Sequence, residues 1–372
     1  LMRCKYYYVV ALLFLSSITV AAQTDAVDKY VKTEMQRKHI PGLTLALIKD
    51  GKVIKQRAYG LANIELNVPA SVGDVYQIAS TTKTFTGAAI MTLVEEGKLS
   101  LDDKVTKLLP ELRAAWGEVT VRHCLTHTSG LPDVFADECS EAIAETRDEA
   151  LKKLALMPVR RPGEKWEYNT TGYVLLGMII ERLSGVSYEE FLARRFFRPL
   201  GMTSSRFGDY KEIIKGRTSL YTNFQICRGN DFKMSSEKIW TALVLPYTYV
   251  PYEHPGAGLN STIGDLVKWN LAIDKGRVLR QSTLNEMWTA VKLNDGKIFR
   301  SEGTEGYGCG WFVDDRPKHK AVGHFGGLST GYIKYLDDKL TVIVLTNLEG
   351  ADAEPLVKGI AALHISELRQ AA

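Results

Sequence analysis

Apolar and polar residues alternate with two different periods along the chain, and the first elements are predicted clearly. Apolar spacing of three and four predicts a helix over residues 25–39, which Pro41-Gly42 ends. Strand formers over residues 43–49 and 53–59 flank Asp50-Gly51, a strong two-residue turn signal. The N-terminal part therefore predicts a helix followed by a β-hairpin.

The middle of the chain is mostly helical in pattern. Ser261 and Thr262 with Asp265 open one of these helices in the manner of an N-cap. Residues 205–258 contain turn formers and aromatic residues without a sustained period, which predicts long loops that line a substrate cleft. The predicted helices cover residues 81–96, 141–156, 171–183, 188–197 and 262–273.

Toward the C-terminus the period returns to that of strands. Strands are predicted over residues 307–313, 320–325, 332–336 and 340–346, and a last helix over residues 352–368. Together with the N-terminal hairpin, they predict an α/β (α+β) fold, an antiparallel sheet flanked by N- and C-terminal helices with an inserted, mostly helical lobe. The expected boundaries are 23–79 and 285–372 for the sheet lobe and 80–284 for the helical lobe, as one catalytic unit.

Composition adds an expectation about export. The chain has 372 residues, 45% hydrophobic and 24% charged, as in globular proteins. Arg3 and Lys5 precede an uncharged run that ends in the small residues Val20-Ala21-Ala22, which is typical of an export signal. Residues 1–22 are thus expected to direct export to the periplasm or the extracellular space and to be removed, leaving no stable membrane span. An uncleaved anchor is the alternative.

The charge pattern argues against nucleic acid as a partner. The formal charge of +4 falls to +2 when Arg3 and Lys5 leave with the signal, and no basic stripe stands out. We expect a small-molecule or peptide acyl substrate, no cofactor and no metal, and the oligomeric state stays open. The four cysteines after the signal can be free or bridged, since they form no close pair: Cys124, Cys139, Cys227 and Cys309.

Ser80 and Lys83 form an S-x-x-K pattern at the start of a predicted helix. The spacing of three places the hydroxyl and the amine on one face. A serine hydroxyl becomes a good nucleophile when a nearby base takes its proton, and a lysine with a lowered pKa can be that base. The same spacing also arises when a helix cap precedes a solvated lysine, so the pattern alone does not decide.

Four further motifs follow in order, and together they resemble the serine β-lactamase and penicillin-binding protein superfamily. The resemblance extends over residues 25–365 and is closest to the class C-like branch, which includes DD-peptidases, D-aminopeptidases and esterases. It implies a β-lactamase/transpeptidase-like fold and a serine hydrolase that works through an acyl-enzyme. The motifs are residues 127–132 (HTSGLP), 166–173 (WEYNTTGY), 257–262 (AGLNST) and 323–327 (GHFGG).

The resemblance also implies roles for individual residues. Ser80 would be the nucleophile, Lys83 its proton partner, and Tyr168 the group that relays the proton to the leaving group. The backbone N–H groups of Ser80 and Gly327 would form the oxyanion hole, where glycine permits close approach. The residues expected to bind substrate are Thr170, His324 and Gly326.

Two departures from the family pattern bear on the substrate. Thr170 stands where the family usually has an asparagine, and a threonine hydroxyl cannot bridge two groups as an amide does. His324 stands where β-lactamases have a lysine, so a fixed cation for a substrate carboxylate is missing. We therefore expect esters or D-peptides to be better substrates than β-lactams, unless Arg217 or Arg228 supplies the charge.

Two other motifs in the chain match patterns of different enzyme classes, but their sequence context does not fit those classes. Gly327-Leu328-Ser329-Thr330-Gly331 matches the nucleophile elbow of α/β-hydrolases, with Asp352 and His364 following in order, but a strand is predicted after Ser329 where that fold needs a helix. His123 and His127 have a metal-ligand spacing, yet Cys124 stands where a zinc protease needs glutamate, which favours structural histidines. A non-catalytic scaffold or binding protein remains the alternative to an enzyme.

Overall fold

The computed structural model describes residues 25–135, 142–208, 212–222, 241–242, 249–300, 305–327 and 329–370. The predicted export signal, and with it the question of a cleaved or retained segment, lies outside these residues. None of the helices in the described ranges combines the length and the apolar character needed to cross a bilayer.

An eight-stranded sheet combines strands from both ends of the chain, in the order β3-β2-β1-β13-β12-β11-β10-β9. Neighbouring strands are antiparallel, with Leu45 of β1 opposite Val344 of β13. This sheet with its flanking helices confirms the predicted fold class. Its strands are β1 (Gly42–Lys49), β2 (Lys52–Asn63), β3 (Val68–Pro69), β9 (Gly306–Tyr307), β10 (Phe312–Asp314), β11 (Ala321–Gly326), β12 (Thr330–Tyr335) and β13 (Leu340–Thr346).

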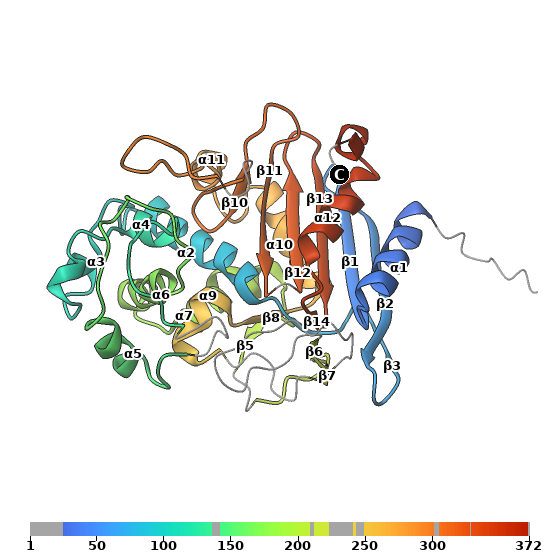
Figure 1. Cartoon of the computed structure of the whole chain (residues 1–372), viewed down its shortest axis with the longest axis horizontal. Helices are drawn as coiled ribbons and strands as arrows, with labels where there is room; N and C mark the ends of the chain where they lie inside the picture. The colour runs from blue at the N-terminus through green and yellow to red at the C-terminus, as the bar shows by residue number, and fades with distance from the viewer. Residues whose placement is uncertain are drawn as a thin grey trace, which may run out of the picture.

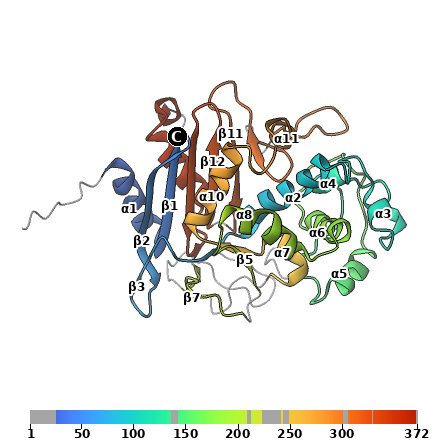
Figure 2. The ribbon, with the colours of Figure 1, turned by 180° about the vertical axis from the view of Figure 1, so that it is seen from behind.

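Helices cover both faces of this sheet. The terminal helices α1 (Ala26–Lys38) and α12 (Ala353–Ala362) lie on the face seen in Figure 1, and α10 (Ile263–Asp274) lies on the opposite face, seen in Figure 2. Strand β1 explains the division, because Leu45 and Leu47 pack with the terminal helices while Ala46 and Ile48 belong to the other core. The strand is therefore buried on both sides.

The remaining helices gather beside the sheet, at the left of Figure 1. Phe85 of α2 stacks on Trp269 of α10 with 4.2 Å between ring centroids, which joins the helical region to the sheet layer. The exact lobe boundaries stay a prediction. The helices here are α2 (Lys83–Glu95), α3 (Val105–Leu108), α4 (Val121–Leu125), α5 (Arg147–Leu154), α6 (Thr171–Ser184), α7 (Tyr188–Leu192), α8 (Arg198–Leu200), α9 (His254–Ala257) and α11 (Gln281–Met287).

Local sequence signals explain the elements that form as predicted. Asp50 and Gly51 both adopt positive φ, 50° and 70°, as a two-residue turn that matches strand twist requires. The Thr262 side chain accepts a hydrogen bond from the Asp265 N–H and caps α10. The hairpin of β1 and β2 and the start of α10 therefore follow from these few residues.

Two predicted elements were wrong in extent. The helix predicted over residues 141–156 is only α5, because the Thr146 side chain caps it by accepting the Glu149 N–H. The single strand predicted over residues 307–313 is a hairpin of β9 and β10, in which Phe312 pairs with Tyr307. Gly310, with φ of 83°, allows the turn between them.

Two helices end at other residues than their sequence patterns predict. The helix from Tyr188 continues past residue 197 through a π-helical segment, Ala193–Phe197, into α8, where Pro199 lies in the first turn and no N–H is needed from it. The last helix, predicted to reach residue 368, stops as α12 at Ala362, and a 3-10 turn, η5 (Ser366–Gln370), follows.

Between residues 205 and 258 the described parts contain only short elements. A three-stranded sheet of β5 (Arg206–Phe207), β8 (Leu259–Ser261) and β4 (Tyr76–Gln77) ties this region to the chain before Ser80. A second, of β6 (Tyr221–Thr222), β7 (Thr241–Ala242) and β14 (Leu348–Glu349), ties it to the end of the large sheet. Residues 223–240 and 243–248, which include Arg228, lie outside the described residues.

The N-cap of α10 allows a test of this architecture. Thr262→Ala removes the acceptor of the Asp265 N–H, so we expect the free energy of unfolding to fall by about 1 kcal/mol. Thr262→Ser keeps a hydroxyl acceptor and should retain most of that stability. Urea denaturation followed by circular dichroism measures both variants, and equal unfolding of the two would contradict the capping role.

Candidate active site

Ser80 lies on a strained turn that leads into a helix. The turn is a 3-10 segment, η1 (Ala79–Thr82), between β4 and α2. Ala79 has φ of 44°, in the left-handed region that non-glycine residues rarely occupy. The Thr82 hydroxyl donates to the Ala79 carbonyl at 2.6 Å and helps to hold this conformation. Such strain persists where surrounding contacts enforce it, as it does at functional sites.

Lys83, the first residue of α2, lies directly beside Ser80. Its Nζ donates to the Ser80 Oγ at 3.3 Å and to the Gly256 carbonyl at 3.0 Å, and the residue is 1% exposed. Burial lowers the pKa of Lys83 to about 7, although the charge of Asp133 acts in the opposite direction. An amine with this pKa is partly neutral near pH 7 and can accept a proton.

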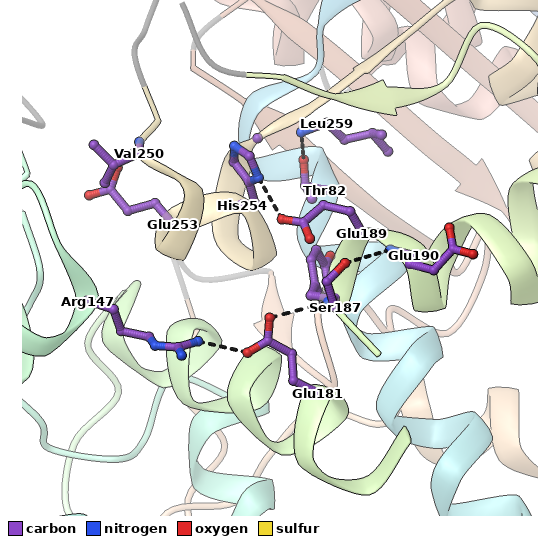
Figure 3. A network of polar contacts seen from close by, with 12 residues as sticks. Thr82, Arg147, Glu181, Ser187, Glu189, Glu190, Val250, Glu253, His254 and Leu259 are labelled. Atoms are coloured by element: carbon purple, nitrogen blue, oxygen red, sulfur yellow. Dashed lines mark hydrogen bonds and ion pairs between the residues drawn. The ribbon is translucent and has the colours of Figure 1, made fainter. Parts of the chain in front are cut away.

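The Gly256 carbonyl is held in place by an anchored segment. Glu189 of α7 contacts the His254 Nδ1 at 2.9 Å at the start of α9, as Figure 3 shows. At the other end the Leu259 N–H donates to the Thr82 hydroxyl at 3.2 Å. The α9 segment is thereby tied both to α7 and to the turn that carries Ser80.

Tyr168 completes the arrangement predicted from the motifs. Its phenol lies within hydrogen-bonding reach of the Ser80 side chain, and the Lys83 Nζ lies 4.6 Å from its ring centroid. The residue is 37% exposed, and its ring lies against that of His127, tilted by 32°, with 4.2 Å between the ring centroids. Burial of the phenol raises the pKa of Tyr168, so the group is protonated at neutral pH and can donate. Ser80, Lys83 and Tyr168 therefore come together.

His127 is a buried structural group of this site. Its Nδ1 accepts the Asn169 N–H at 3.0 Å, so the ring proton is on Nε2 and the ring is neutral. Burial and the charge of Lys83 hold the pKa of His127 well below its usual value. The ring thus supports Tyr168 without adding charge.

The two residues after Tyr168 form hydrogen bonds with other groups of the protein. The Asn169 amide donates to the Leu131 carbonyl and accepts the Gly172 N–H, both at 2.9 Å, so it points away as expected. Thr170 is buried, and its N–H donates to the Asp133 carboxylate at 3.0 Å. Its methyl group faces Gly256, where an added Cβ would lie 2.7 Å away. The expected substrate-binding role of Thr170 stays a prediction.

The end of β11 packs closely against the turn that carries Ser80. A Cβ on Gly326 would lie 2.2 Å from the Ile78 carbonyl oxygen, so glycine is required there. Gly327 has φ of 49° and lies beside Ala79. The Thr330 hydroxyl donates to the Ile78 carbonyl at 3.2 Å and fastens the two segments together. This approach brings the two residues predicted to form the oxyanion hole, Ser80 and Gly327, close to one another.

His324 is buried, and both of its ring nitrogens contact protein groups. Nδ1 lies 2.8 Å from the Phe325 carbonyl, which can only accept, so Nδ1 carries the proton. Nε2 then accepts from the Tyr307 hydroxyl at 2.9 Å. Burial and the charge of Lys83 lower the pKa of His324 to about 3. The ring is neutral, as expected, but its nitrogens are engaged inside the protein.

The other candidates do not form a second centre among the described residues. Ser329 lies in the turn between the antiparallel strands β11 and β12, which is wrong for the elbow of an α/β-hydrolase, and its hydroxyl donates to the Gly326 carbonyl at 3.3 Å. The His123 Nδ1 accepts the Thr120 N–H in a capping box. Groups of three potential metal ligands do not occur in the described ranges.

Only some of the arginine and cysteine candidates lie within the described residues. Arg217 forms an isolated parallel bridge with Val75, and the residue is partly buried. Cys124 and Cys309 are free and buried, whereas Cys139 and Cys227 lie outside the described residues.

Sequence reasoning missed three partners of the predicted residues: Asp133, Gly256 and Tyr307. Asp133 directly follows the HTSGLP motif and Gly256 directly precedes AGL, so a wider reading of both motifs would have included them. Tyr307 lies in a segment predicted as one uniform strand, and no local signal marks it as the partner of His324.

Comparisons with known proteins show which family and fold the chain shares. Penicillin-binding protein 4* of Bacillus subtilis (strain 168) is 32% identical over 326 residues, which is 84% of this chain and 69% of that protein. The octameric penicillin-binding protein homologue from Pyrococcus abyssi matches with a TM-score of 0.77 and 30% identity, over 91% of this chain and 77% of the other. D-amino acid amidase from Ochrobactrum anthropi SV3, at 23% identity, TM-score 0.76 and coverage of 92% and 99%, shares the fold. The sequence model described as Beta-lactamase matches residues 27–365, and the chain belongs to this family.

Proposed function

We propose that the protein is a serine hydrolase that forms an acyl-enzyme on Ser80 from an ester, amide or β-lactam. One observation carries the proposal: the Ser80 hydroxyl lies 3.3 Å from a buried lysine amine whose pKa is lowered to about 7. Membership of the beta-lactamase family supports the same chemistry.

In the proposed reaction the Ser80 Oγ bonds to the substrate carbonyl carbon while its proton passes to the neutral Lys83 amine. The carbonyl oxygen becomes an anion, which the N–H groups of Ser80 and Gly327 stabilise. Tyr168 delivers a proton to the leaving oxygen or nitrogen as its bond to carbon breaks, and Lys83 returns a proton to Tyr168. Water then attacks the acyl-enzyme by the reverse proton route, which releases the acid and restores Ser80.

Neutral esters or amides fit the surroundings of Ser80 better than β-lactams do. A buried Thr170 replaces the usual amide that would orient the acyl group, and His324 is neutral and bonded to Tyr307, so it offers no charge to a substrate carboxylate. The structural neighbour named D-amino acid amidase supports an amide or peptide substrate. The proposal includes export of the protein, directed by residues 1–22.

Labelling of Ser80 tests the function directly. A fluorophosphonate should add one label, and mass spectrometry should find it on Ser80, because this hydroxyl has an amine base at 3.3 Å. Ser80→Ala should lose the label, whereas Ser329→Ala should keep it. A fully reactive Ser80→Ala variant would contradict the proposal, and the absence of labelling in the native protein would favour a non-catalytic binding protein.

Proton transfer gives a second prediction. Lys83→Ala and Tyr168→Phe should each lower kcat/KM by on the order of a hundredfold or more, and the double variant should lose less than the product of the two effects. Because a base acts when deprotonated, native kcat/KM should rise with pH through about 7, the pKa of Lys83. Lys275→Ala, an exposed lysine after α10, is the matched control. Near-normal turnover by either active-site variant would refute its assigned role.

Substrate preference gives a third prediction. Loss of a charged and a neutral hydrogen bond to a β-lactam costs roughly 2 to 4 kcal/mol, so kcat/KM for p-nitrophenyl butyrate should exceed that for nitrocefin by roughly thirty- to a thousandfold. Since the pKa of His324 is about 3, its charge should not alter this ratio between pH 5.5 and 8. A strong preference for nitrocefin would mean that another group holds the carboxylate.

A further inference from the structure

The Gly256 carbonyl, which accepts a hydrogen bond from Lys83, belongs to α9, a helix of only four residues. A helix this short is not stable by itself, so its position depends on contacts with its neighbours. Pro255 packs so closely on α6 that a Cβ on Gly177 would lie 2.3 Å from its ring. The position of the carbonyl is therefore decided partly outside the turn that carries Ser80.

Two consecutive residues of α7 hold α9 through hydrogen bonds, one of them by way of α2. The Thr86 hydroxyl donates to the Pro255 carbonyl at 2.6 Å, so the Tyr188 hydroxyl, 2.7 Å away, donates to Thr86. Glu189 contacts the His254 Nδ1 at 2.9 Å (Figure 3). Glu189 thus acts on the first residue of α9, and Tyr188 acts on the second.

Glu189 and His254 form a hydrogen bond with a fixed direction. Burial acts to raise the pKa of Glu189, but hydrogen bonds, chiefly the one from His254, hold it below its ordinary value, so the carboxyl is ionised at neutral pH. A carboxylate can only accept, so the His254 Nδ1 carries the proton. The His254 Nε2 is buried and has no hydrogen-bond partner within the described part of the chain. Glu189 is therefore the one polar group in that part of the chain that orients the ring.

The ring of His254 touches groups at both ends of α9. It stacks on Phe207 with 5.3 Å between ring centroids, and a Cβ on Gly258, the residue after the helix, would lie 2.4 Å from its Cδ2. Because the space around the ring is filled, a rotation of the ring away from Glu189 would displace the backbone of α9. That backbone includes the Gly256 carbonyl.

We propose that Glu189 and His254 are positioning residues, which hold the Gly256 carbonyl where it keeps the Lys83 amine against the Ser80 hydroxyl. This inference rests on the proposed serine hydrolase function. It assigns a role in the reaction to a pair that lies outside the ordered sequence motifs and acts through Lys83. Reaction rates depend steeply on such alignment, so a small displacement of the amine would slow proton transfer from Ser80.

The test measures the rate at which a fluorophosphonate labels Ser80 in variants of the pair. Glu189→Ala removes the acceptor, and His254→Phe removes the donor but keeps a ring that can stack on Phe207. We expect each variant to lower the maximal rate of labelling by on the order of tenfold and to leave the half-saturating concentration unchanged, because the pair aligns the amine and does not bind the reagent. The double variant should lose no more than either single variant, since both break the same contact.

Conservative changes should restore the rate. Glu189→Gln keeps an oxygen that accepts from His254, and His254→Asn keeps an N–H that can donate to Glu189, so both should label within about twofold of the native rate. Glu190→Ala is the matched control, because this neighbouring carboxylate of α7 pairs with Arg194 and Arg198 instead of α9. It should label at the native rate.

A Lys83→Ala background separates positioning from a general loss of structure. If the pair acts through Lys83, Glu189→Ala should slow labelling in the native protein and have little further effect when the amine is absent. The inference would be overturned by an equal slowing in both backgrounds, by native rates in both Glu189→Ala and His254→Phe, or by failure of both variants to fold, as measured by circular dichroism. Absence of labelling in the native protein would instead overturn the proposed function.

Discussion

The removal of the Lys83 amine from water is the constraint on which the rest of the site depends. A buried ammonium group is costly, so its proton affinity falls and the amine becomes a usable base near neutrality. The cost is limited by two contacts, with the Ser80 hydroxyl and the Gly256 carbonyl. Both contacts come from segments that must be held rigidly, because a small displacement would leave a buried charge without a partner.

Most of the surrounding architecture serves to hold these segments. The Thr86 hydroxyl of α2 donates to the Pro255 carbonyl at 2.6 Å, which binds α9 to the helix that carries Lys83. The large sheet meets the same turn from the other side, where Gly326 touches the Ile78 carbonyl and Thr330 bonds to it. Ser80, the proposed nucleophile, is thus fixed between a sheet made from both chain ends and helices from the middle of the chain.

The two buried histidines around Ser80 add no fixed charge to the site. His127 and His324 are both kept neutral by burial and by the neighbouring lysine, and each is fixed by a hydrogen bond to a backbone group. Such a site can stabilise the developing oxyanion with backbone dipoles and offers little to a permanent carboxylate.

The sequence alone predicted the fold class and most strands of the terminal sheet from local signals, and it identified the catalytic candidates through the resemblance of its ordered motifs to a family. Period-two runs, turn residues such as Asp50-Gly51, caps such as Thr262, and the spacing of Ser80 and Lys83 act over a few residues. The failed prediction of a single strand involved a choice that no short window contains. Residues 307–313 had the composition of one strand, and only pairing with the sheet separated β9 from β10.

The tertiary structure decided which chemical state each candidate has. Whether Lys83 can act as a base and whether His324 offers a nitrogen to substrate depend on burial and on partners far away in the chain. Gly256 lies 173 positions from Lys83, and Tyr307 of β9 meets His324 of β11 only because β10 pairs with both strands. Desolvation and hydrogen bonding are properties of the packed molecule, so residue types and spacing could propose these groups but could not assign their protonation or their orientation.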